Sequence, residues 1–375
     1  MRIAIVGSRG IPGNYGGFET CAEQLSTMLV ERGHHVSVYC MRPYSKGTSR
    51  WYRGVRRLFL PTIPHKALEK IVFASLSLIH VTFSRANVVL ILGVSGAPLA
   101  LLPRLAGKKV FVNVDGLEWK RKKWGRLARV VLKQCERLAG IVANKVITDA
   151  RCIQEYYLQT YGKPSAFIPY GADASHVPPG PTMEKYGLRP REYALYVSRL
   201  EPENNAHLVV DAFNRLESDL KLVVVGDAPY SSDYIRGLRS KSNGNVVFTG
   251  YVFGEGYREL QSNAYFYVQA TEVGGTHPAL VEAMAYGNCV LVSDVPEHRE
   301  VAADAAVPFK NGSSTDLQQK MSFLLRHPGI VQDYRQRAVR RARERYRWEY
   351  VTDCHEHLFA HPNGRFSTPA SDRGS

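Results

Sequence analysis

Two acids and a pair of glycines occur in an order that suits a phosphorylated ligand, in the segment TEVGGTHPALVEAMAYG. Glu272 follows a buried strand-like run, and Pro278 is a residue favoured in the first turn of a helix. Free N–H groups at a helix start bind phosphate oxygens, so we expect Gly275 and Thr276 to face a diphosphate. Glu282 is expected to bind sugar or ribose hydroxyls, because a buried carboxylate needs partners. A glutamate near the N-terminus of the helix, favoured by the helix dipole, is the alternative.

A second polar group follows the predicted strand YALYVS. Arg199 comes directly after this strand, at the position where ligands bind in open parallel sheets. Glu203 and Asn204 lie in the polar loop just beyond it. We expect Arg199 to meet the phosphates of the ligand, with Glu203 and Asn204 as further contacts. An ordinary surface arginine is the alternative.

The N-terminal loop GSRGIPGNYGG carries five glycines after the strand RIAIV. It does not fit the GxGxxG dinucleotide fingerprint, and the second strand ends without the acid that binds a ribose. Arg42 at that end would suit a 2′-phosphate, so an NADP-dependent reductase stays open, as does a turn without a ligand. Gly16 and Gly17 stand before the next helix, where backbone N–H groups are free for a substrate. Arg9 and Glu19 are the polar groups beside them.

Composition restricts the class of protein. The chain has 375 residues and 45% hydrophobic content, which predicts two globular domains. A net charge of +15 favours an anionic partner, whether nucleic acid, a phosphorylated molecule or a membrane surface. The six cysteines form no CxxC pair, which favours a reducing compartment. No signal peptide is expected, and the apolar stretches 71–83 and 88–102 are too short or too interrupted to span a bilayer.

Predicted strands and helices alternate along the chain, and their continuous apolar strand runs are typical of parallel sheets covered on both faces. A proline-rich segment, FIPYGADASHVPPGPT, interrupts the pattern, which then restarts. We therefore predict two Rossmann-like α/β domains, over residues 1–170 and 171–345. A helix over 346–361 is expected to cross back to the first domain, and residues 362–375 are expected to form a disordered tail.

Taken together and in order, five motifs carry a family resemblance: GNYGGFET, VDGLEWKR, FIPYGAD, VSRLEPENN and EVGGTHPALVEAMAYG. They resemble those of the retaining GT-B glycosyltransferases of family 4, and the chain is similar to the bacterial rhamnosyltransferases that assemble capsular and exopolysaccharide repeat units. The resemblance covers most of the chain. It implies two Rossmann-like domains facing across a cleft, with the nucleotide diphosphate-sugar donor mainly on the C-terminal domain and the acceptor mainly on the N-terminal one.

The resemblance also implies roles for individual residues. Arg199 would bind the donor phosphates, and the backbone of Tyr251 and Val252 would meet the base. Glu272 and Glu282 would correspond to the pair of acids that the family carries. In this chain the two acids are ten positions apart where the family spacing is eight, so the intervening loop is longer.

Two departures from the family pattern concern charge. Asn204 stands where the family usually has a lysine. Asp115 stands where many relatives have a histidine that contacts the donor sugar, so Asp115 is expected to orient a hydroxyl or take the proton of the acceptor. An N-cap of the following helix is the alternative for Asp115. Glu118 is assigned to the acceptor side, together with Arg9 and Glu19.

The reaction implied by the resemblance is sugar transfer with retention, by a hexosyltransferase. No DxD triad occurs, so neither a metal nor another cofactor is expected. Arg199 and the amides at Gly275 and Thr276 would stabilise the leaving nucleotide diphosphate, which makes Asp115, Glu272 and Arg199 the predicted catalytic groups. The expected reaction moves L-rhamnose from dTDP-rhamnose to a lipid-linked saccharide. A UDP- or GDP-sugar donor and a non-catalytic partner of the same fold are alternatives.

The segment 119–137 holds eight Lys or Arg residues and one acid, interleaved with Trp119 and Trp124. This composition favours an anionic membrane surface. A solvated helix face is one alternative, and nucleic acid is another that no recognised motif supports. An acceptor carried on a polyprenyl diphosphate would account for this patch and for the apolar stretch 71–83. We therefore expect a cytoplasmic protein at the inner face of the plasma membrane.

Overall fold

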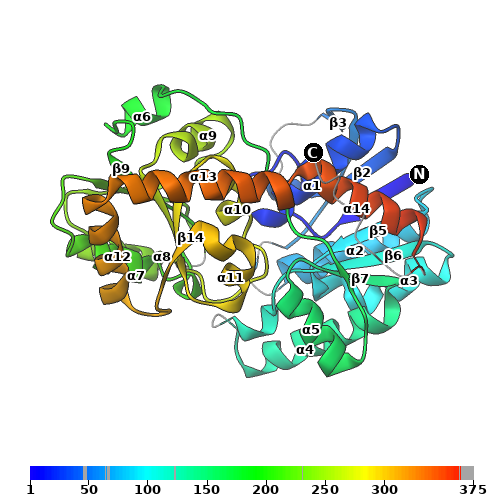
Figure 1. The fold of residues 1–375 in the computed structure, drawn as a ribbon. Coiled ribbons are helices and arrows are strands. Elements are labelled where there is room, and N and C mark those ends of the chain that lie inside the picture. Colours follow the sequence, from blue (N-terminus) through cyan, green and yellow to red (C-terminus); the bar gives the residue numbers. More distant parts are fainter. Residues whose placement is uncertain are drawn as a thin grey trace. The chain divides into compact units, whose positions relative to one another are not determined.

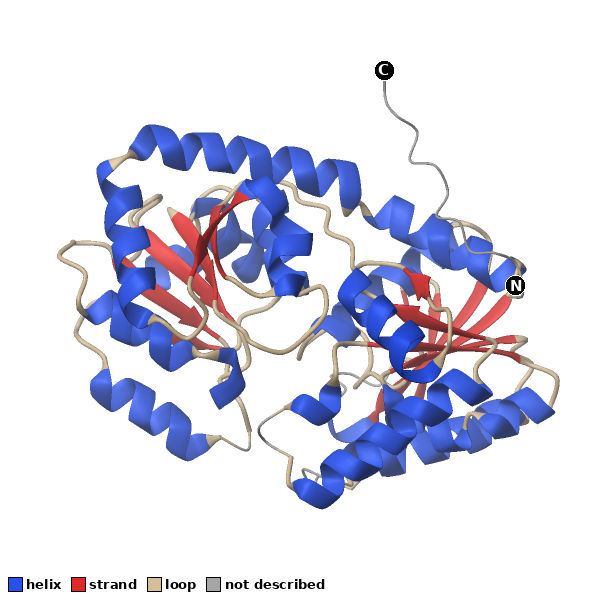
Figure 2. Ribbon diagram, turned by 60° about the horizontal axis from the view of Figure 1, so that its bottom comes forward, coloured by secondary structure: helices blue, strands red, loops and turns tan. Residues whose placement is uncertain are grey.

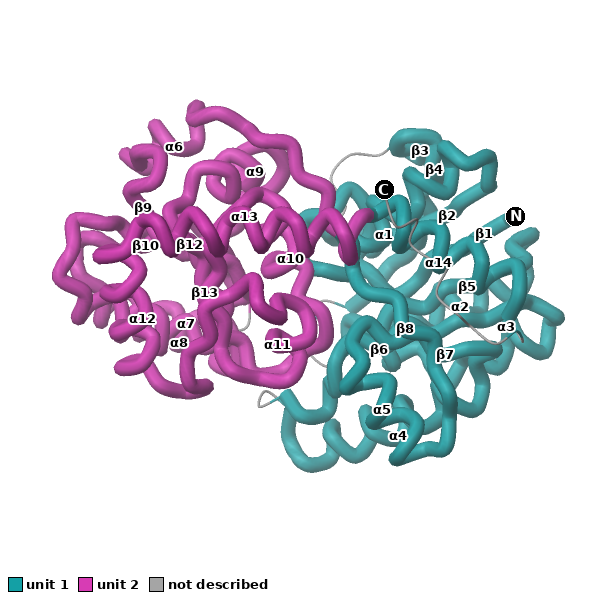
Figure 3. The backbone as a smooth tube through the Cα atoms, viewed as in Figure 1, with its two compact units in different colours: residues 1–171, 348–375 teal, residues 172–347 magenta. Residues whose placement is uncertain are grey.

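The structure is a computed structural model, and the residues that it describes are 1–44, 49–63, 65, 68–121, 124–229, 231–362 and 364. The chain forms two compact units (Figure 3). Unit 1 comprises residues 1–171 and 348–375, and unit 2 comprises residues 172–347. Most of the tail predicted over 362–375, together with Lys122 and Lys123 of the basic segment, lies outside the described residues.

Unit 1 is built on an eight-stranded sheet in the order β3-β4-β2-β1-β5-β6-β7-β8, parallel except for the β3–β4 pair (Figure 1). Its strands are β1 (Arg2–Val6), β2 (His35–Met41), β3 (Trp51–Tyr52), β4 (Val55–Leu60), β5 (Val88–Leu92), β6 (Lys109–Val114), β7 (Lys145–Thr148) and β8 (Ala166–Phe167). Its α-helices are α1 (Gly17–Glu31), α2 (Glu69–Thr82), α3 (Leu101–Leu105), α4 (Arg126–Val142), α5 (Arg151–Tyr161) and α14 (Trp348–Ala360). Short 3₁₀ turns are η1 (Arg42–Tyr44), η2 (Val94–Leu99) and η3 (Glu118–Lys120).

Unit 2 has a six-stranded, wholly parallel sheet in the order β11-β10-β9-β12-β13-β14. Its strands are β9 (Tyr193–Val197), β10 (Lys221–Val225), β11 (Val246–Gly250), β12 (Phe266–Gln269), β13 (Cys289–Ser293) and β14 (Ala306–Phe309). Its α-helices are α6 (Pro181–Lys185), α7 (Ala206–Asn214), α8 (Ser232–Lys241), α9 (Gly254–Asn263), α10 (Pro278–Ala285), α11 (Pro296–Ala302), α12 (Ser314–Arg326) and α13 (Pro328–Arg345). Two 3₁₀ turns are η4 (Pro202–Asn204) and η5 (Ala303–Ala305).

Each sheet is covered by helices on both faces (Figure 2). Successive residues of a strand point to opposite faces, so the two faces enter separate cores. In β1, Ile3 and Ile5 belong to one apolar cluster, whereas Ala4 and Val6 belong to the other. The strands of unit 2 divide between two cores in the same way. This double coverage explains why the strand runs are apolar throughout instead of alternating with polar residues.

The last helix, α14, belongs to unit 1, although residues 172–347 of unit 2 intervene in the chain. It packs on α1, where the Thr352 hydroxyl lies 3.4 Å from the sulfur of Met28. At its start Trp348 lies so close to Gly171 that a Cβ on this glycine would be 2.5 Å from the indole.

Within the part of the chain that the structure describes, no helix is both long and apolar enough to cross a lipid bilayer.

Candidate functional site

The site predicted in unit 2 lies where the strand order of the sheet reverses. From β9 the chain proceeds to β10 and β11 on one side, whereas β12, β13 and β14 extend on the other. Ligands of open α/β sheets bind outside the carboxyl ends of the strands at this point. Arg199 follows β9 and Glu272 follows the neighbouring strand β12. The fold therefore brings two of the predicted catalytic groups to adjacent strand ends.

The loop that carries Arg199 is held by buried polar contacts. The side-chain amide of Asn204 donates to the Arg199 carbonyl at 2.7 Å, and the Tyr196 hydroxyl donates to the Asn204 carbonyl at 2.5 Å. Gly226 allows the neighbouring loop to approach, because a Cβ there would be 1.8 Å from the Ser198 oxygen. The Asn204 side chain thus supports the Arg199 backbone. A direct contact of this side chain with the nucleotide-sugar donor stays a prediction.

Asn205, which the sequence analysis did not select, positions Glu272. Its side-chain amide donates to the Ala270 carbonyl at 3.0 Å and to the Glu272 carboxylate at 3.1 Å. The residue has φ +60°, a left-handed conformation that asparagine tolerates better than most residues. Glu203, two residues before Asn205, is fully buried, and its backbone carbonyl accepts from the Glu272 N–H at 3.2 Å. The sequence signal that could have identified Asn205 is its position directly before a helix.

The glycine loop before α10 is tightly packed. A Cβ on Gly274 would lie 2.3 Å from the ring of His277, and that ring meets the ring of buried His298 at a centroid distance of 5.0 Å. Burial lowers the pKa of His298 to about 4, so this imidazole is neutral at physiological pH. Gly275 and buried Thr276 occupy the positions just before the helix. Their contact with phosphate remains a prediction.

Glu282 lies in the second turn of α10 and is hydrogen-bonded within unit 2. The Tyr257 hydroxyl donates to its Oε2 at 2.6 Å, and Gln261 donates to the same hydroxyl at 2.8 Å. Burial raises the pKa of Glu282 to about 7. The helix-dipole alternative is wrong, because Glu282 does not lie in the first turn of α10. A half-buried carboxyl of this kind is suited to bind hydroxyl groups.

An aromatic pair follows β11 at the same edge of the sheet. The ring of Tyr251 stacks on Phe253, with centroids 5.6 Å apart and planes 18° from parallel. Both rings are exposed, whereas Val252 between them packs against the core. Aromatic faces of this kind stack on nucleobases. A further aromatic residue, Phe253, thus directly follows the predicted residues Tyr251 and Val252, and the sequence analysis did not select it.

In unit 1 the glycine loop also lies at a reversal of strand order, between β1 and β5. Gly7 has φ +101°, and a Cβ there would be 2.2 Å from the Leu92 carbonyl oxygen. Only glycine permits this approach of the two strand ends. Gly16 is the N-cap of α1, and the helix begins at Gly17, one residue earlier than expected.

Two carboxylates of α1 hold the glycine loop in place. Glu19 accepts from the Arg9 backbone N–H at 2.7 Å, and Glu23 accepts from the Gly13 N–H at 2.6 Å. Glu19 is buried, and this burial raises its pKa. The loop is therefore held by internal hydrogen bonds, and whether it binds a ligand stays untested. Glu19 has an internal role, and its predicted role on the acceptor side stays untested.

Arg9 lies between two tyrosine rings and beside a carboxylate. Its guanidinium carbon is 3.5 Å from the Tyr15 ring centroid and 4.1 Å from that of Tyr44. Its Nη2 forms an ion pair with buried Glu69, the first residue of α2, at 2.8 Å. The Tyr44 hydroxyl donates to the other oxygen of Glu69 at 2.5 Å. Arg9 thus connects the loop to α2 and has internal partners for its charge.

Asp115 follows β6 and does not cap a helix. One carboxylate oxygen accepts from the Gly116 N–H at 3.0 Å, and the other lies 3.9 Å from Arg121. Arg121 pairs more closely with Glu118, at 2.7 Å. The next helical turn, η3, has Leu117 as its N-cap, so the capping alternative for Asp115 is wrong. Glu118 forms an ion pair with Arg121, and its predicted contact with the sugar acceptor stays a prediction.

Tyr170 shows which acids of unit 1 gather around one place. It is buried, and its pKa is raised by burial and then by the charges of Asp115, Asp149 and Glu19, among others. Asp115 follows β6, Asp149 follows β7, and Glu19 lies in the first turn of α1. The fold thus brings the predicted residues Asp115 and Glu19 to one edge of the sheet. Asp149 and Tyr170 were not selected from the sequence.

The basic segment forms η3 and most of α4. Its tryptophans are half-buried: Trp119 packs against the core, and Trp124 donates to Glu118 at 3.3 Å. Both tryptophans are therefore partly covered, and a membrane contact of this segment stays a prediction. More exposed apolar side chains are Leu127, Val130 and Val131 of α4, which are 79%, 58% and 46% exposed.

Comparisons with known proteins found a match for each half of the chain. Residues 1–173 match a domain of unknown function, DUF1972, and residues 182–345 match the family Glycosyl transferases group 1. In sequence the chain is similar to the O-antigen chain mannosyltransferase B of Escherichia coli, with 29% identity over 34% of this chain and 35% of that protein. It is also 27% identical to the GDP-mannose-dependent alpha-(1-6)-phosphatidylinositol monomannoside mannosyltransferase of Mycolicibacterium smegmatis, over 58% and 59% of the two chains. The matches thus span between about a third and three fifths of these relatives.

Two solved structures share the fold over nearly the whole chain. Sucrose-phosphate synthase from Thermosynechococcus elongatus aligns with a TM-score of 0.83 and 17% identity, over 96% of this chain and 98% of that one. HepE of Anabaena, in complex with UDP-glucose, aligns with a TM-score of 0.77 and 15% identity, over 96% and 99%. The fold is therefore GT-B, with two Rossmann-like domains. Residues 182–345 of this chain, which include Arg199, Glu272 and Glu282, match the model of the Glycosyl transferases group 1 family.

Proposed function

We propose that the protein transfers a sugar from a nucleotide diphosphate donor to a lipid-linked saccharide, with retention, in glycan biosynthesis. The observation that carries the proposal is the placement of Arg199 and Glu272 at adjacent strand ends of a domain that matches the Glycosyl transferases group 1 family. A positive guanidinium and a tethered carboxylate beside a glycine loop suit a substrate with both phosphates and hydroxyl groups.

The proposed division of work follows the chemistry of the groups. Arg199 and the N–H groups of Gly275 and Thr276 stabilise the charge that develops on the leaving diphosphate, so the reaction needs no metal or other cofactor. Glu272 and Glu282 bind hydroxyl groups of the donor. In unit 1, Asp115 orients or deprotonates the acceptor. Donor contacts by Gly16, Gly17 and Glu203 belong to the same proposal.

The identity of the donor sugar is the most specific part of the proposal. The motif resemblance favours dTDP-rhamnose. The names of the relatives point elsewhere: two are mannosyltransferases, and HepE is solved with UDP-glucose. A decisive screen therefore includes dTDP-rhamnose, GDP-mannose and UDP-glucose, each with a polyprenyl diphosphate-linked saccharide as acceptor, and identifies products by mass.

R199Q and E272Q are expected to reduce transfer at least about tenfold, because each removes a charge-assisted contact to the substrate. E217Q, at an exposed loop position of unit 2, is the matched control and should keep full activity. Stabilisation of the protein against heat by NADPH and by none of the nucleotide-sugars would contradict the proposal. So would unchanged transfer in both site variants.

We further propose that unit 1 binds the inner face of the plasma membrane. Exposed apolar side chains occur on three helices that contact one another through η2: Ile71, Leu76 and Ile79 on α2, Leu101, Leu102 and Leu105 on α3, and Leu127, Val130 and Val131 on α4. On α4 they alternate with exposed Arg126, Arg129, Lys133 and Arg137. The acid of this segment, Glu136, is buried, so the exposed face is basic and apolar, as anionic lipid requires.

Co-sedimentation with vesicles of phosphatidylglycerol and phosphatidylcholine tests this part. The L127S/V130S variant should bind these vesicles several-fold more weakly than the wild type, whereas F323S, at an exposed position on α12, should bind equally. Equal binding of the α4 variant, or no binding of the wild type to anionic vesicles, would contradict membrane association and leave the transfer reaction to its own test.

A further inference from the structure

A buried histidine near the glycine loop of unit 2 has one ring nitrogen without a hydrogen bond. This residue, His298, belongs to α11, which follows β13, the neighbour of β12 in the sheet. Its Nδ1 lies 2.9 Å from the carbonyl oxygen of Ser293 and 3.0 Å from the hydroxyl of the same residue. Its Nε2 is buried and has no hydrogen-bond partner within the described part of the chain. Buried polar atoms are nearly always paired, so the hydrogen-bond network around His298 is incomplete.

The contacts of His298 determine where its proton lies. A carbonyl oxygen only accepts hydrogen bonds, so Nδ1 carries the proton and donates to Ser293. Burial lowers the pKa of His298 to about 4, so the ring is neutral and Nε2 keeps a lone pair. The Ser293 hydroxyl in turn donates to the carbonyl of Thr271, the residue before Glu272, at 3.2 Å. Nε2 is therefore a hydrogen-bond acceptor on a ring that is tied to the ends of β12 and β13.

The ring in contact with His298 is that of His277, the N-cap residue of α10. The two ring centroids are 5.0 Å apart, and the ring planes are 61° from parallel. The His277 ring also packs on Gly274, where a Cβ would lie 2.3 Å from it. His277 itself is half-buried. Two neighbours thus hold a partly exposed imidazole at the start of α10, beside a buried acceptor.

The start of α10 offers few backbone N–H groups to an anion. Pro278 has no N–H, and the N–H groups of Leu280 and Val281 donate to the His277 carbonyl at 3.0 and 3.2 Å. Among the residues predicted to bind the nucleotide-sugar, Arg199 supplies the cationic side chain. A diphosphate presents several charged oxygens, so a further N–H group at this helix start would be favourable.

The strand order indicates which phosphate of a nucleotide would lie nearest to His277. The predicted contacts of the base, Tyr251 and Val252, follow the outer strand β11, whereas the glycine loop follows β12. His298 follows β13, the next strand beyond β12. A nucleotide that starts at β11 and extends past β9 therefore brings its β-phosphate, which is the one farther from the base, closest to His277.

We propose that His277 is a further donor-binding residue, whose imidazole binds the β-phosphate of the nucleotide-sugar, and that His298 is its positioning residue. This inference rests on the proposed function, in which the diphosphate lies at Gly275 and Thr276, directly before His277. With the diphosphate bound, a cationic His277 ring donates one N–H to a phosphate oxygen and the other to Nε2 of His298. A neutral His298 permits this cation, whereas a charged one would repel it.

The charges near the glycine loop favour a cationic His277 overall. The elements around the loop carry the acids Glu203, Glu272, Glu282, Asp294 and Glu297 and the cations Arg199 and Arg299. Arg299 is paired with Asp294. The positive end of the α10 dipole acts in the opposite direction. A bound diphosphate adds negative charge beside the ring and so favours its cationic form.

Isothermal titration of the full chain tests the inference, with UDP, GDP and dTDP as probes, each beside its nucleoside monophosphate. For the diphosphate that the wild type binds most tightly, H277A should weaken binding about tenfold, the loss of one charge-assisted contact. Binding of the matching monophosphate should change less than about twofold, because it lacks the β-phosphate. H277A removes no side-chain cap of α10 among the described residues. The matched control is H327A, since His327 is the exposed N-cap of α13 and also precedes a proline.

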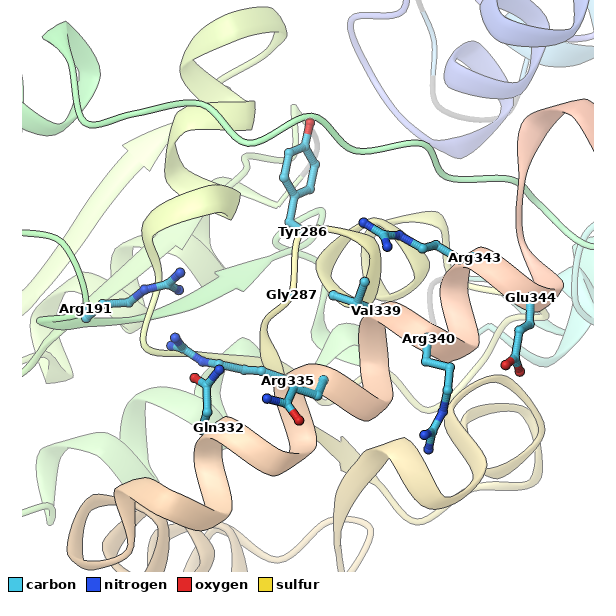
Figure 4. A pocket seen from close by; sticks show the side chains of 10 residues that line it. Arg191, Tyr286, Gly287, Gln332, Arg335, Val339, Arg340, Arg343 and Glu344 are labelled. Atoms are coloured by element: carbon cyan, nitrogen blue, oxygen red, sulfur yellow. The ribbon is translucent and has the colours of Figure 1, made fainter. Parts of the chain in front are cut away.

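A second control tests for an effect of net charge. Arg340 borders a separate cavity along α13 (Figure 4). The lining of that cavity includes Arg191, which precedes β9, so the cavity lies at the opposite edge of the parallel sheet from His277. Arg191 and Arg335 there both donate to the Ala264 carbonyl, at 2.5 and 3.0 Å. R340Q should bind the diphosphate as the wild type does, and so should H327A.

Two variants test the positioning role of His298. Asparagine can keep a hydrogen bond to the Ser293 carbonyl but has no acceptor at the place of Nε2, whereas glutamine can put its side-chain oxygen there. H298N should therefore weaken diphosphate binding several-fold, and H298Q should recover part of it. H277A/H298N should bind no more weakly than H277A, because both changes remove the same contact. Additive losses would contradict the positioning role. If the His298 variants do not fold, the two affinities of H277A decide.

The outcomes separate this inference from the proposed function. Unchanged diphosphate binding in H277A, when R199Q weakens that binding, would overturn the role of His277 and leave the proposed function standing. Equal weakening for diphosphate and monophosphate would overturn it too, since the contact would then not be to the β-phosphate. The same loss in H327A or R340Q would have the same consequence. If the wild type binds none of the three diphosphates, the proposed function is wrong, and this inference with it.

Discussion

Replacing Glu282 by glutamine should stabilise unit 2 above neutral pH and leave its stability unchanged in acid. The carboxyl has a pKa of about 7 in the folded protein, against an ordinary value of 4.5. Between these values the unfolded chain loses its proton while the folded protein keeps it. The free energy of unfolding therefore falls as the pH rises from 4.5 to about 7, and then stays level. Glutamine has no proton to lose, and its amide oxygen still accepts from the Tyr257 hydroxyl.

The magnitude follows from the size of the pKa difference. A shift of about 2.5 units at ~1.36 kcal/mol per unit gives an upper value of about 3.4 kcal/mol above pH 7. Glu282 is half-buried, so solvent screening reduces the expected gain to about 1–2 kcal/mol. The same change should weaken donor binding about tenfold, since a carboxylate contact to hydroxyl groups is replaced by a neutral one.

Hydrogen exchange of the α10 and β12 peptides against pH is the appropriate assay. All four tryptophans lie in unit 1, at positions 51, 119, 124 and 348, so their fluorescence reports on that unit. E217Q, at an exposed position of unit 2, is the matched control and should follow the wild type at every pH. If the wild type and E282Q lose protection with the same pH dependence, the burial argument for Glu282 is refuted.

Three further changes test the supports of the site. N205A should lower transfer about tenfold by freeing Glu272, and N205D, which keeps an acceptor in place of the donor, should not restore it. G226A should destabilise unit 2 by more than about 3 kcal/mol in chemical unfolding followed by circular dichroism, because its Cβ would overlap a backbone oxygen at 1.8 Å. E69Q should cost about 2–4 kcal/mol in unfolding followed by tryptophan fluorescence, because it leaves Arg9 buried without its counter-charge, and an unchanged midpoint would contradict that ion pair.

Local sequence patterns were sufficient to predict a strand where that strand is buried on both faces of its sheet. YALYV and KVFVNV, which form β9 and β6, could be recognised because such strands need continuous apolar runs. The same rule missed β4, whose sequence VRRLFL contains two arginines. Arg57 is buried in β4 and donates to the carbonyls of Ser49 and Ile11, the latter at 3.2 Å. Ile11 is 46 positions from Arg57 in the chain, so no local pattern reports that acceptor.

The sequence by itself determined which residues stand at the ends of strands, and therefore that Arg199, Glu272 and Asp115 belong to a ligand-binding edge. It determined this because strand ends and helix starts depend on neighbours in the chain. The tertiary structure alone decided the partners: Asn205 with Glu272, Arg9 with Glu69, and Arg191 beside Arg335. These pairs are 60 to 144 positions apart by the numbering, and they meet because of strand order and helix packing, which are properties of the whole fold.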